Sequence, residues 1–352
     1  MTDATHTFPS LGRVRLGVQL FMFVLLVWGA SVVGHYSAEK LSDALPALSC
    51  AYDMENAGYC VLIPLQHQMH HRVGQALVAA QQVGLKVVLP LAMTLLTFLA
   101  FFFVLGKAFC GWVCPLGTLQ ELVQRAGRRF GLPLHALDTT GTRRVRPVKW
   151  LILLGLVLTL PLLTGLGITP HEFGNPYCDV CPARIATTLL SGNTEQLALN
   201  AASPLSFALG ALGNTVFGFV AVAALAIRQP FCRICPMLAL NGAFRHLSLT
   251  RLVKRPHDKC ARCGICAQAC PMDIHEIQRE SGRKAFHEDC TLCGRCAEFC
   301  PDDDVIALTF GPFRWFRSRR SYYKRRVRAE SPQGELKPLK FMPRPGPSAE
   351  RP

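Results

Sequence analysis

Two runs of cysteine in the last third of the chain constrain its structure more than any other feature. They start at Cys260 and Cys290 and share the spacing C-x2-C-x2-C-x3-C-P, offset by 290 − 260 = 30 residues. In such a doubled motif three close thiolates wrap one face of a [4Fe–4S] cubane, and the fourth Cys ligates the other cluster. A pair of zinc ribbons also uses C-x2-C units but does not need eight cysteines in this order. We therefore expect two clusters, the first held by Cys260, Cys263, Cys266 and Cys300, and the second by Cys290, Cys293, Cys296 and Cys270.

The rest of the chain is too apolar for an ordinary soluble protein. Half of the 352 residues are hydrophobic and only 17% are charged. Four stretches without Asp, Glu, Lys or Arg are each close to the ~20 apolar residues that cross a bilayer, and these are residues 17–34, 87–105, 150–167 and 204–227. Arg13 and Arg15 precede the first stretch as in a secretory signal, but its apolar run is long for one, so we expect an uncleaved anchor.

Lys and Arg collect on one side of the expected spans, which predicts their orientation. Segment 106–149 carries eight of them, whereas 35–86 carries three and 168–203 carries only Arg184. We expect a multi-pass protein of a bacterial inner membrane, with both termini, segment 106–149 and the cluster-binding module in the cytoplasm. The net charge of +15 then reflects membrane orientation and contact with lipid, and we expect no nucleic-acid partner.

The other eight cysteines recur in the same order in two halves of the membrane part, an outer pair before an inner pair each time. The offsets are 178 − 50 = 128, 181 − 60 = 121, 232 − 110 = 122 and 235 − 114 = 121 residues, which indicates an internal duplication. Parallel repeats are related by an axis along the membrane normal, so they gather equivalent residues at one face. This predicts an inner quartet, Cys110, Cys114, Cys232 and Cys235, and an outer quartet, Cys50, Cys60, Cys178 and Cys181.

The two quartets carry different expectations because they face different compartments. A reducing cytoplasm disfavours a structural disulfide, so the inner quartet is expected to hold a metal centre or a redox thiol set. For the outer quartet a metal centre and disulfides or redox-active thiols are open alternatives. Two stacked centres near opposite faces would divide the ~30 Å hydrocarbon core into shorter electron hops.

The expected fold class is an α-helical membrane protein with four transmembrane helices in two parallel pseudo-repeats, followed by a C-terminal α+β module of the bacterial 2[4Fe–4S] ferredoxin type. The expected domains are a first membrane repeat at 1–130, a second at 131–253, the ferredoxin module at 254–310 and a basic, Pro-rich tail at 311–352. The basic aromatic part of that tail, 313–328, either lies on anionic lipid or is solvated.

The string F-C-G-W-V-C-P-L-G-T-L-Q-E from Phe109 to Glu121, the four spans and the two-cluster module resemble the NapH and NosR group of membrane-bound iron–sulfur proteins, to which MauN-type and copper-reducing CcoG-type proteins are similar. The resemblance implies the membrane component of a quinol dehydrogenase, passing electrons between the quinone pool, its iron–sulfur centres and a redox partner across the membrane. Two features depart from the group. The second inner motif is C-x2-C-P instead of C-x3-C-P, and a large outer flavin domain as in NosR-type chains is missing.

Several functional hypotheses follow, all without a catalytic acid, base or nucleophile. The leading one is an oxidoreductase component that relays electrons between quinol, or a periplasmic or membrane redox protein, and the clusters, with one or two further iron–sulfur centres and quinone as additional cofactors. Its rivals are a ferredoxin-driven copper reductase or maturation factor, and a transmembrane thiol carrier that uses Cys178 and Cys181 as a dithiol. The outer histidines are candidates for haem, copper or a quinol hydroxyl, or are interfacial side chains: His67, His70, His71 and His171.

Overall fold

The computed structural model describes residues 10–33, 62–74, 99–192 and 203–330, together with the isolated positions 78, 92, 96, 194 and 197–199. Cys50, Cys60 and most of the expected span 87–105 lie outside the described residues. The chain divides into two compact units. The larger one takes its described residues from 15–250 and 288–293, and the smaller one from 10–14, 251–287 and 294–330.

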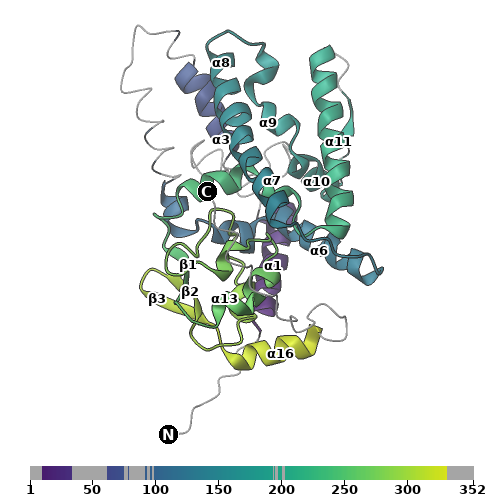
Figure 1. Ribbon diagram of the computed structural model, residues 1–352. Helices are drawn as coiled ribbons and strands as arrows, with labels where there is room; N and C mark the ends of the chain where they lie inside the picture. Colours follow the sequence, from purple (N-terminus) through teal and green to yellow (C-terminus); the bar gives the residue numbers. More distant parts are fainter. Residues whose placement is uncertain are drawn as a thin grey trace. The chain divides into compact units, whose positions relative to one another are not determined.

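Three helical stretches are long and apolar enough to cross a membrane, namely Leu11–Trp28, Thr139–Gly165 and Pro204–Ala226. They lie in α1 (Leu11–Val33), in α7 (Thr139–Leu151) with its continuation through the π-helical segment η3 (Ile152–Thr159) and α8 (Leu160–Gly165), and in α11 (Pro204–Ala226) (Figure 1). They correspond to the expected first, third and fourth spans. The chain is thus a mostly helical membrane protein, and the fourth helix of the expected set stays a prediction.

Each inner Cys pair is followed by a helix that begins with proline. Pro115 opens α6 (Pro115–Arg129) and Pro236 opens α12 (Pro236–Ala243). Proline suits the first helical position because it lacks an N–H that would go unpaired there and because its φ is preset. Short turns come before the helices, η2 (Phe109–Val113) and η6 (Phe231–Arg233). The Cys-Pro dipeptides therefore place one cysteine of each pair at a helix start.

The part of the expected second outer loop that the structure describes continuously, 168–192, is largely helical and partly buried. It contains η4 (His171–Gly174), α9 (Pro176–Asp179) and α10 (Pro182–Leu190). Its side chains Tyr177, Cys178, Ile185 and Ala186 are at most 5% exposed. Because these side chains pack into the core, α9 lies against η3, and α10 lies against α11.

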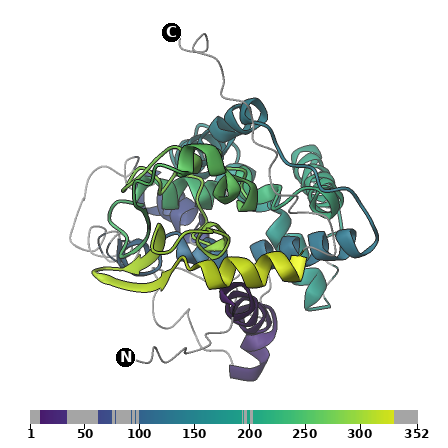
Figure 2. The same ribbon diagram turned by 60° about the horizontal axis from the view of Figure 1, so that its bottom comes forward.

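Close helix contacts hold the larger unit together. α6 packs on α11 (Figure 1), and Figure 2 shows the same pair from another side. Gly127 of α6 approaches the Leu225 backbone so closely that no Cβ would fit. The preceding elements α3 (Leu62–His67) and η1 (Gln68–Gly74) reach α8, where Gly74 and Gly165 leave room for each other's backbone. Val157 of η3 and Ala239 of α12 are fully buried at the centre of this packing.

The smaller unit contains a three-stranded sheet in the order β1 (Thr250–Lys254), β2 (Ile306–Phe310) and β3 (Phe313–Arg317). β2 and β3 are antiparallel, with a bulge between Leu308 and Thr309. Leu252, Phe299, Ile306 and Leu308 form its core and are at most 1% exposed. Short helices complete the unit, namely α13 (Cys260–Cys263), α14 (Ile265–Ala269), η7 (Glu276–Gln278), α15 (Arg295–Glu298) and α16 (Arg320–Glu330).

Candidate metal centres

The inner quartet is formed by two turns and the helix starts that follow them. Cys110 lies in η2 and Cys114 directly before α6, whereas Cys232 lies in η6 and Cys235 directly before α12. Every thiol of this group lies close enough to the others for their negative charges to repel one another. The structure thus brings together the four residues that the repeat pattern pairs.

Two side-chain amides cross between the halves of the inner quartet. The Gln120 amide Nε2 donates to Cys232 Sγ at 3.6 Å, and the Asn241 amide Nδ2 donates to Cys110 Sγ at 3.5 Å. Gln120 follows Cys114 by six residues, and Asn241 follows Cys235 by six. Each helix therefore supplies a hydrogen-bond donor to the first cysteine of the opposite half. Such N–H···S hydrogen bonds stabilise negative charge on sulfur and tune cluster potentials.

The environment of the inner quartet fits a metal cluster. Burial, and then the neighbouring Cys114, raise the pKa of Cys110 to about 12, and burial raises the pKa of Cys232 as well. Four such thiols remain protonated unless a bound cation compensates their charge, because metal ligation requires thiolates. No group of three Cys, His, Asp or Glu in the described part of the chain is arranged to hold a single metal ion. One zinc, with Zn–S bonds of ~2.3 Å, needs closer sulfurs than a cubane does.

The described half of the outer quartet repeats one hydrogen-bonding arrangement of the inner one. Gln66 Nε2 donates to Cys178 Sγ at 3.2 Å, and Gln66 Oε1 accepts from the Tyr177 N–H at 3.3 Å. At the inner quartet, Gln120 Oε1 accepts from the Phe231 N–H at 3.0 Å, beside its contact with Cys232. In both cases one Gln side chain makes two hydrogen bonds: its amide N–H donates to the sulfur of a Cys, and its carbonyl oxygen accepts from the backbone N–H of the residue before that Cys.

The two tiers of cysteine lie nearer to each other than the sequence suggested. Cys181, directly before α10, is close enough to Cys114 and Cys235 for their thiolate charges to interact. We had expected the outer cysteines near the opposite membrane face. The reason for the difference is the burial of α9 and α10, which carries Cys178 and Cys181 into the core. Among the fourteen described cysteines, none is joined to another by a disulfide.

The cysteines expected to hold cluster one all belong to the smaller unit. Burial raises the pKa of Cys266 to about 11, and the charges of Cys300, Cys260 and Cys263 add to that rise. These four therefore gather around one place, although their positions span 40 residues of sequence, 300 − 260. For cluster two, Cys290 and Cys293 belong to the larger unit, while Cys270 and Cys296 belong to the smaller one.

The segment Glu288–Cys293, which carries two of the cluster-two cysteines, is held firmly within the larger unit. Lys149 of α7 is fully buried and forms ion pairs with Asp289 and, at 3.1 Å, with Glu288. Arg146 Nε binds Asp289 Oδ2 at 2.7 Å. The Trp112 indole N–H donates to the Leu292 carbonyl at 3.0 Å. Three points of attachment thus fix this segment against α7 and η2.

A fully buried lysine lies between the inner quartet and this segment. Lys107 Nζ donates to the Glu288 carbonyl, and Lys107 is 0% exposed. Burial lowers the pKa of Lys107 to about 8, against the opposing pull of the Cys290 and Cys110 thiolates. Cys110 and Cys290 also repel each other directly. One cation is therefore shared by a cysteine of each predicted centre.

The spacing of the F-C-G-W-V-C-P string has a local structural cause. Gly111 faces the Thr291 carbonyl so closely that a side chain at 111 would not fit. Gln19 of α1 donates to the Gly111 carbonyl at 3.1 Å and to Glu121 at 3.3 Å. Glu121 in turn binds the buried Arg15 at 2.6 Å. The string therefore determines where α6 begins and provides the surface against which segment Glu288–Cys293 packs.

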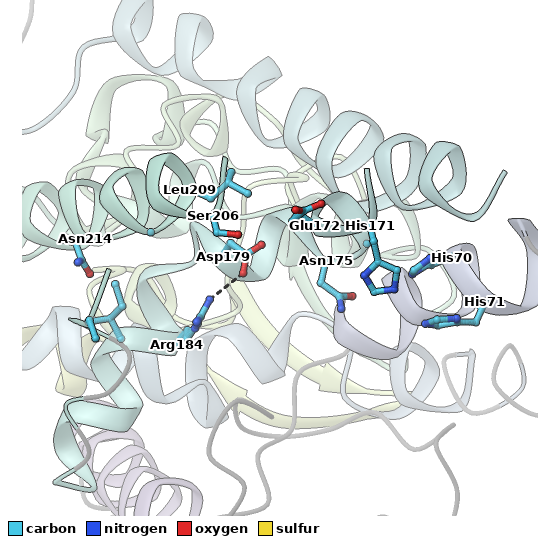
Figure 3. A pocket seen from close by; sticks show the side chains of 14 residues that line it. His70, His71, His171, Glu172, Asn175, Asp179, Arg184, Ser206, Leu209 and Asn214 are labelled. Carbon is cyan, nitrogen blue, oxygen red and sulfur yellow. Dashed lines mark hydrogen bonds and ion pairs between the residues drawn. The ribbon is translucent and has the colours of Figure 1, made fainter. Parts of the chain in front are cut away.

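Three of the four predicted outer histidines, His70, His71 and His171, line one end of a cavity of about 320 Å³ in the larger unit. The His70 and His71 rings stack at 4.0 Å, and the His171 ring lies 5.3 Å from that of His70 (Figure 3). His67 contacts His71 at 4.3 Å. Burial, and then the charges of His71, His171 and His67, lower the pKa of His70, so its imidazole is neutral at pH 7.

Family comparisons agree with the cysteine geometry. A model described as "4Fe-4S binding domain" matches residues 87–133 and again 209–255, and one described as "4Fe-4S dicluster domain" matches 252–310. The first model therefore matches at two starting points that are 209 − 87 = 122 residues apart, and each match contains one inner Cys pair. This chain is therefore similar to ferredoxin-type 4Fe-4S proteins.

Curated relatives of this chain match about half of its length. YccM of Escherichia coli is 30% identical over 182 residues, which are 51% of this chain and 45% of YccM. The regulatory protein NosR of Stutzerimonas stutzeri is 28% identical over 172 residues, 47% of this chain and 20% of NosR. The ferredoxin-type protein NapH of Escherichia coli is 29% identical over 166 residues, 47% of each chain. The alignments thus span less than half the length of these relatives, and no solved structure matches the chain.

These findings confirm the resemblance to NapH, NosR and MauN, and the structure adds three candidate membrane spans among the described residues. Sequence reasoning missed the polar residues that surround the cysteines. Gln66 and Gln120 share a recognisable signal, because each lies six residues after a cysteine of its half, Cys60 and Cys114. Lys107 and Lys149 carried no such signal, since their partners lie more than a hundred residues away in the chain.

Proposed function

We propose that this protein relays electrons across a bacterial inner membrane between quinol, or an outer redox partner, and [4Fe–4S] clusters on the cytoplasmic side. In this proposal the larger unit has four spans in two repeats, and the region 254–310 is a ferredoxin module with two clusters. Both termini are cytoplasmic. When bound, the clusters supply one-electron oxidation and reduction, and the protein supplies their spacing and potentials.

The observation that carries this proposal is the sharing of Lys107 between Cys110 and Cys290. A cysteine of the inner quartet and a cysteine of cluster two lie around one buried cation within a single compact unit. An isolated ferredoxin module would need no such connection to membrane-embedded cysteines. The arrangement suits electron exchange between an inner centre and cluster two, because closely spaced centres allow short electron hops.

The outer tier extends the same proposal. Gln66 holds Cys178 as Gln120 holds Cys232, and Cys181 lies beside Cys114 and Cys235. We assign Cys178 and Cys181, with the predicted partners Cys50 and Cys60, to a second centre in the larger unit. A thiol carrier would instead place Cys178 and Cys181 where a partner protein could reach them. Cys178 is only 5% exposed, which disfavours that alternative.

Counting iron and acid-labile sulfide in the purified full-length chain tests the proposal. The ferredoxin-type runs alone account for about eight irons, two cubanes of four. Each further occupied quartet adds iron, so we expect clearly more than eight per chain, with an equal amount of sulfide. Quinol added anaerobically should then reduce the clusters. A chain with eight irons or fewer, or with bound zinc in place of iron, would refute the relay through the membrane part.

A further inference from the structure

The cavity beside the outer tier has a lining rich in hydrogen-bond acceptors. Asn175 Oδ1 and Asn214 Oδ1 are buried, and neither has a hydrogen-bond partner among the residues that the structure describes. The orientation of the Asn214 amide is fixed, because its Nδ2 donates to the Leu197 carbonyl at 3.0 Å. The neutral His70 imidazole adds a third acceptor. Buried acceptors without partners are costly, so the cavity suits a ligand that brings donors.

Other ligand classes fit the cavity less well. An anion would need a cation that is not already neutralised by a carboxylate. Arg184 forms an ion pair with Asp179 at 3.0 Å, as the dashed line in Figure 3 shows. For a metal ion, no three ligating side chains in the described chain are suitably arranged, although His70, His71 and His171 meet there. A neutral molecule with hydroxyl groups can donate hydrogen bonds to these acceptors and needs no further cation in the cavity.

The cavity lies against α11, one of the helices that are long and apolar enough to cross a membrane. Ser206, Leu209, Gly210 and Asn214 of α11 form one of its walls, at the i, i+3, i+4 and i+8 spacing of a single helix face. α11 is one of the candidate spans, and its other faces expose large apolar side chains such as Phe219 and Val222, which are 73% and 69% exposed. A ligand with a polar head and an apolar tail can therefore approach along α11 from lipid.

The cavity is also adjacent to the outer cysteines. Asp179, the last residue of α9, lines the cavity. In the sequence it lies between Cys178 of α9 and Cys181, which directly precedes α10. The backbone carbonyl of Asp179 touches Gly213 of α11, where a Cβ would not fit, so α9 and the α11 wall are in close contact. Cys181 in turn lies near Cys114 and Cys235. A molecule in the cavity is therefore close to the proposed outer centre, to which Cys178 and Cys181 are assigned.

We propose that this cavity is the binding site for the head group of a membrane quinol, with Asn214 Oδ1 accepting a hydrogen bond from one of its two hydroxyls, Asn175 Oδ1 accepting one from the other, and His70 placed to take up a proton. The inference rests on the proposed electron relay and gives it an entry point. Oxidation of the quinol breaks its two O–H bonds and forms two carbonyls. Its two electrons leave one at a time to the one-electron iron–sulfur centres, and its two protons leave through the His70 and His171 imidazoles to the outer solvent.

Gly174 supports the role of His70. A Cβ at position 174 would come within 2.8 Å of His70 Nδ1, so the glycine keeps the space that the imidazole occupies. Gly174→Ala should therefore displace the His70 ring without removing any hydrogen-bonding group. It provides a second way to disturb the site that leaves the asparagines in place.

Calorimetric titration of the full-length protein with decylubiquinol tests the site directly. The clusters are first reduced with dithionite, so that the heat reports binding and not electron transfer. Asn214→Leu and Asn175→Leu should each weaken binding roughly fivefold or more, since each removes one buried hydrogen bond. The matched control is Thr215→Val, which changes the next residue of α11, whose hydroxyl donates to the Ala211 carbonyl of the same helix at 2.8 Å and does not line the cavity among the described residues. It should bind quinol like the parent.

The outcomes separate the site from the relay. If the parent and both asparagine variants bind decylubiquinol equally, or if the parent does not bind it, the cavity is not the quinol site. If quinol still reduces the clusters of the parent, the relay stands with its entry elsewhere, whereas clusters that only dithionite reduces refute the quinol-linked relay itself. Stoichiometric copper or haem that is lost in His70→Gln would also overturn the assignment. Equal iron content in all variants excludes misfolding as the cause.

Discussion

The inner and outer tiers of cysteine in the larger unit share one device and differ in their surroundings. In both, a glutamine holds a cysteine sulfur and the preceding N–H, Gln120 at Cys232 and Gln66 at Cys178. Buried ion pairs such as Lys149 with Asp289 lie near the inner tier, whereas the outer tier adjoins a cavity and the partly exposed pair of Arg184 with Asp179. The difference suggests a closed interior relay beside a tier that is open to a ligand.

The largest effect should come from removing a cysteine of the inner tier. Cys114→Ala should lower the iron content by that of one centre, about four irons for a cubane, and stop quinol-linked reduction of the ferredoxin clusters. Cys181→Ala should also lower iron if the outer tier is a centre in its own right. Metal analysis and EPR spectroscopy measure both effects. Parental iron and parental electron transfer in Cys114→Ala would remove the inner tier from the relay.

Breaking an ion pair near the inner tier should destabilise the folded protein more than breaking one near the outer tier. Lys149→Met removes a fully buried cation from Asp289, which keeps its ion pair with Arg146, and from the partly exposed Glu288, and we expect this to cost about 2 kcal/mol. Arg184→Met breaks the pair with Asp179, whose side chains are 21% and 26% exposed, and should cost about 1 kcal/mol or less. Thermal unfolding, followed by loss of cluster absorbance, gives both values. Equal shifts would show that the ion pairs near the two tiers stabilise the protein alike.

The shared glutamine device predicts a smaller, parallel effect at both tiers. Gln120→Leu and Gln66→Leu each remove a hydrogen bond to sulfur worth about 1 kcal/mol, so the potential of the nearby one-electron centre should fall by roughly 40 mV. Redox titration monitored by EPR gives the shift.

Gln124 provides the control on the same helix as Gln120. It is only 5% exposed, and no hydrogen bond of its amide Nε2 is found in the described chain. Gln124→Leu should leave both potentials unchanged. A shift for Gln120→Leu without one for Gln66→Leu would mean that the outer tier holds no centre.

The smallest expected effect is a loss of stability below about pH 6.5 that arises from His70 in the outer tier. The pKa of His70 is lowered in the folded protein, mainly by burial, so the unfolded chain binds its proton first as the pH falls. Stability that is fully present above the unfolded value of about 6.5 is therefore lost as the pH falls below it. His70→Gln should flatten this part of the profile. A parental profile in that variant would assign the proton uptake to other groups.

The cysteine spacing predicts which cysteines group together better than it predicts how close the two groups lie to each other. The grouping of Cys110, Cys114, Cys232 and Cys235 follows from the repeat, and the helix starts at Pro115 and Pro236 follow from the chemistry of proline. The depth of Cys181 does not follow. Segment 168–203 contains only short apolar runs around Tyr177 and Ile185, too short to reveal that it packs into the core.

The π-helical segments and the ion pairs also lie beyond sequence reasoning. η3 occurs in an apolar stretch, Ile152–Thr159, in which periodicity cannot distinguish a π-helix from an α-helix. Lys149 was predicted to be a cytoplasmic charge flanking a span, yet it is fully buried. Its burial depends on Asp289, which is 140 residues further along the chain. Such a contact arises from tertiary packing and has no local signature.

The exchange of hydrogen bonds between halves carries an evolutionary consequence. Gln66 and Gln120 of the first half bind cysteines of the second half, and Asn241 of the second half binds Cys110 of the first. Neither half alone contains both the sulfur and its donor. An ancestor with one repeat would therefore have completed its sites only as a homodimer, and fusion of two copies would have turned a contact between subunits into one within a single chain.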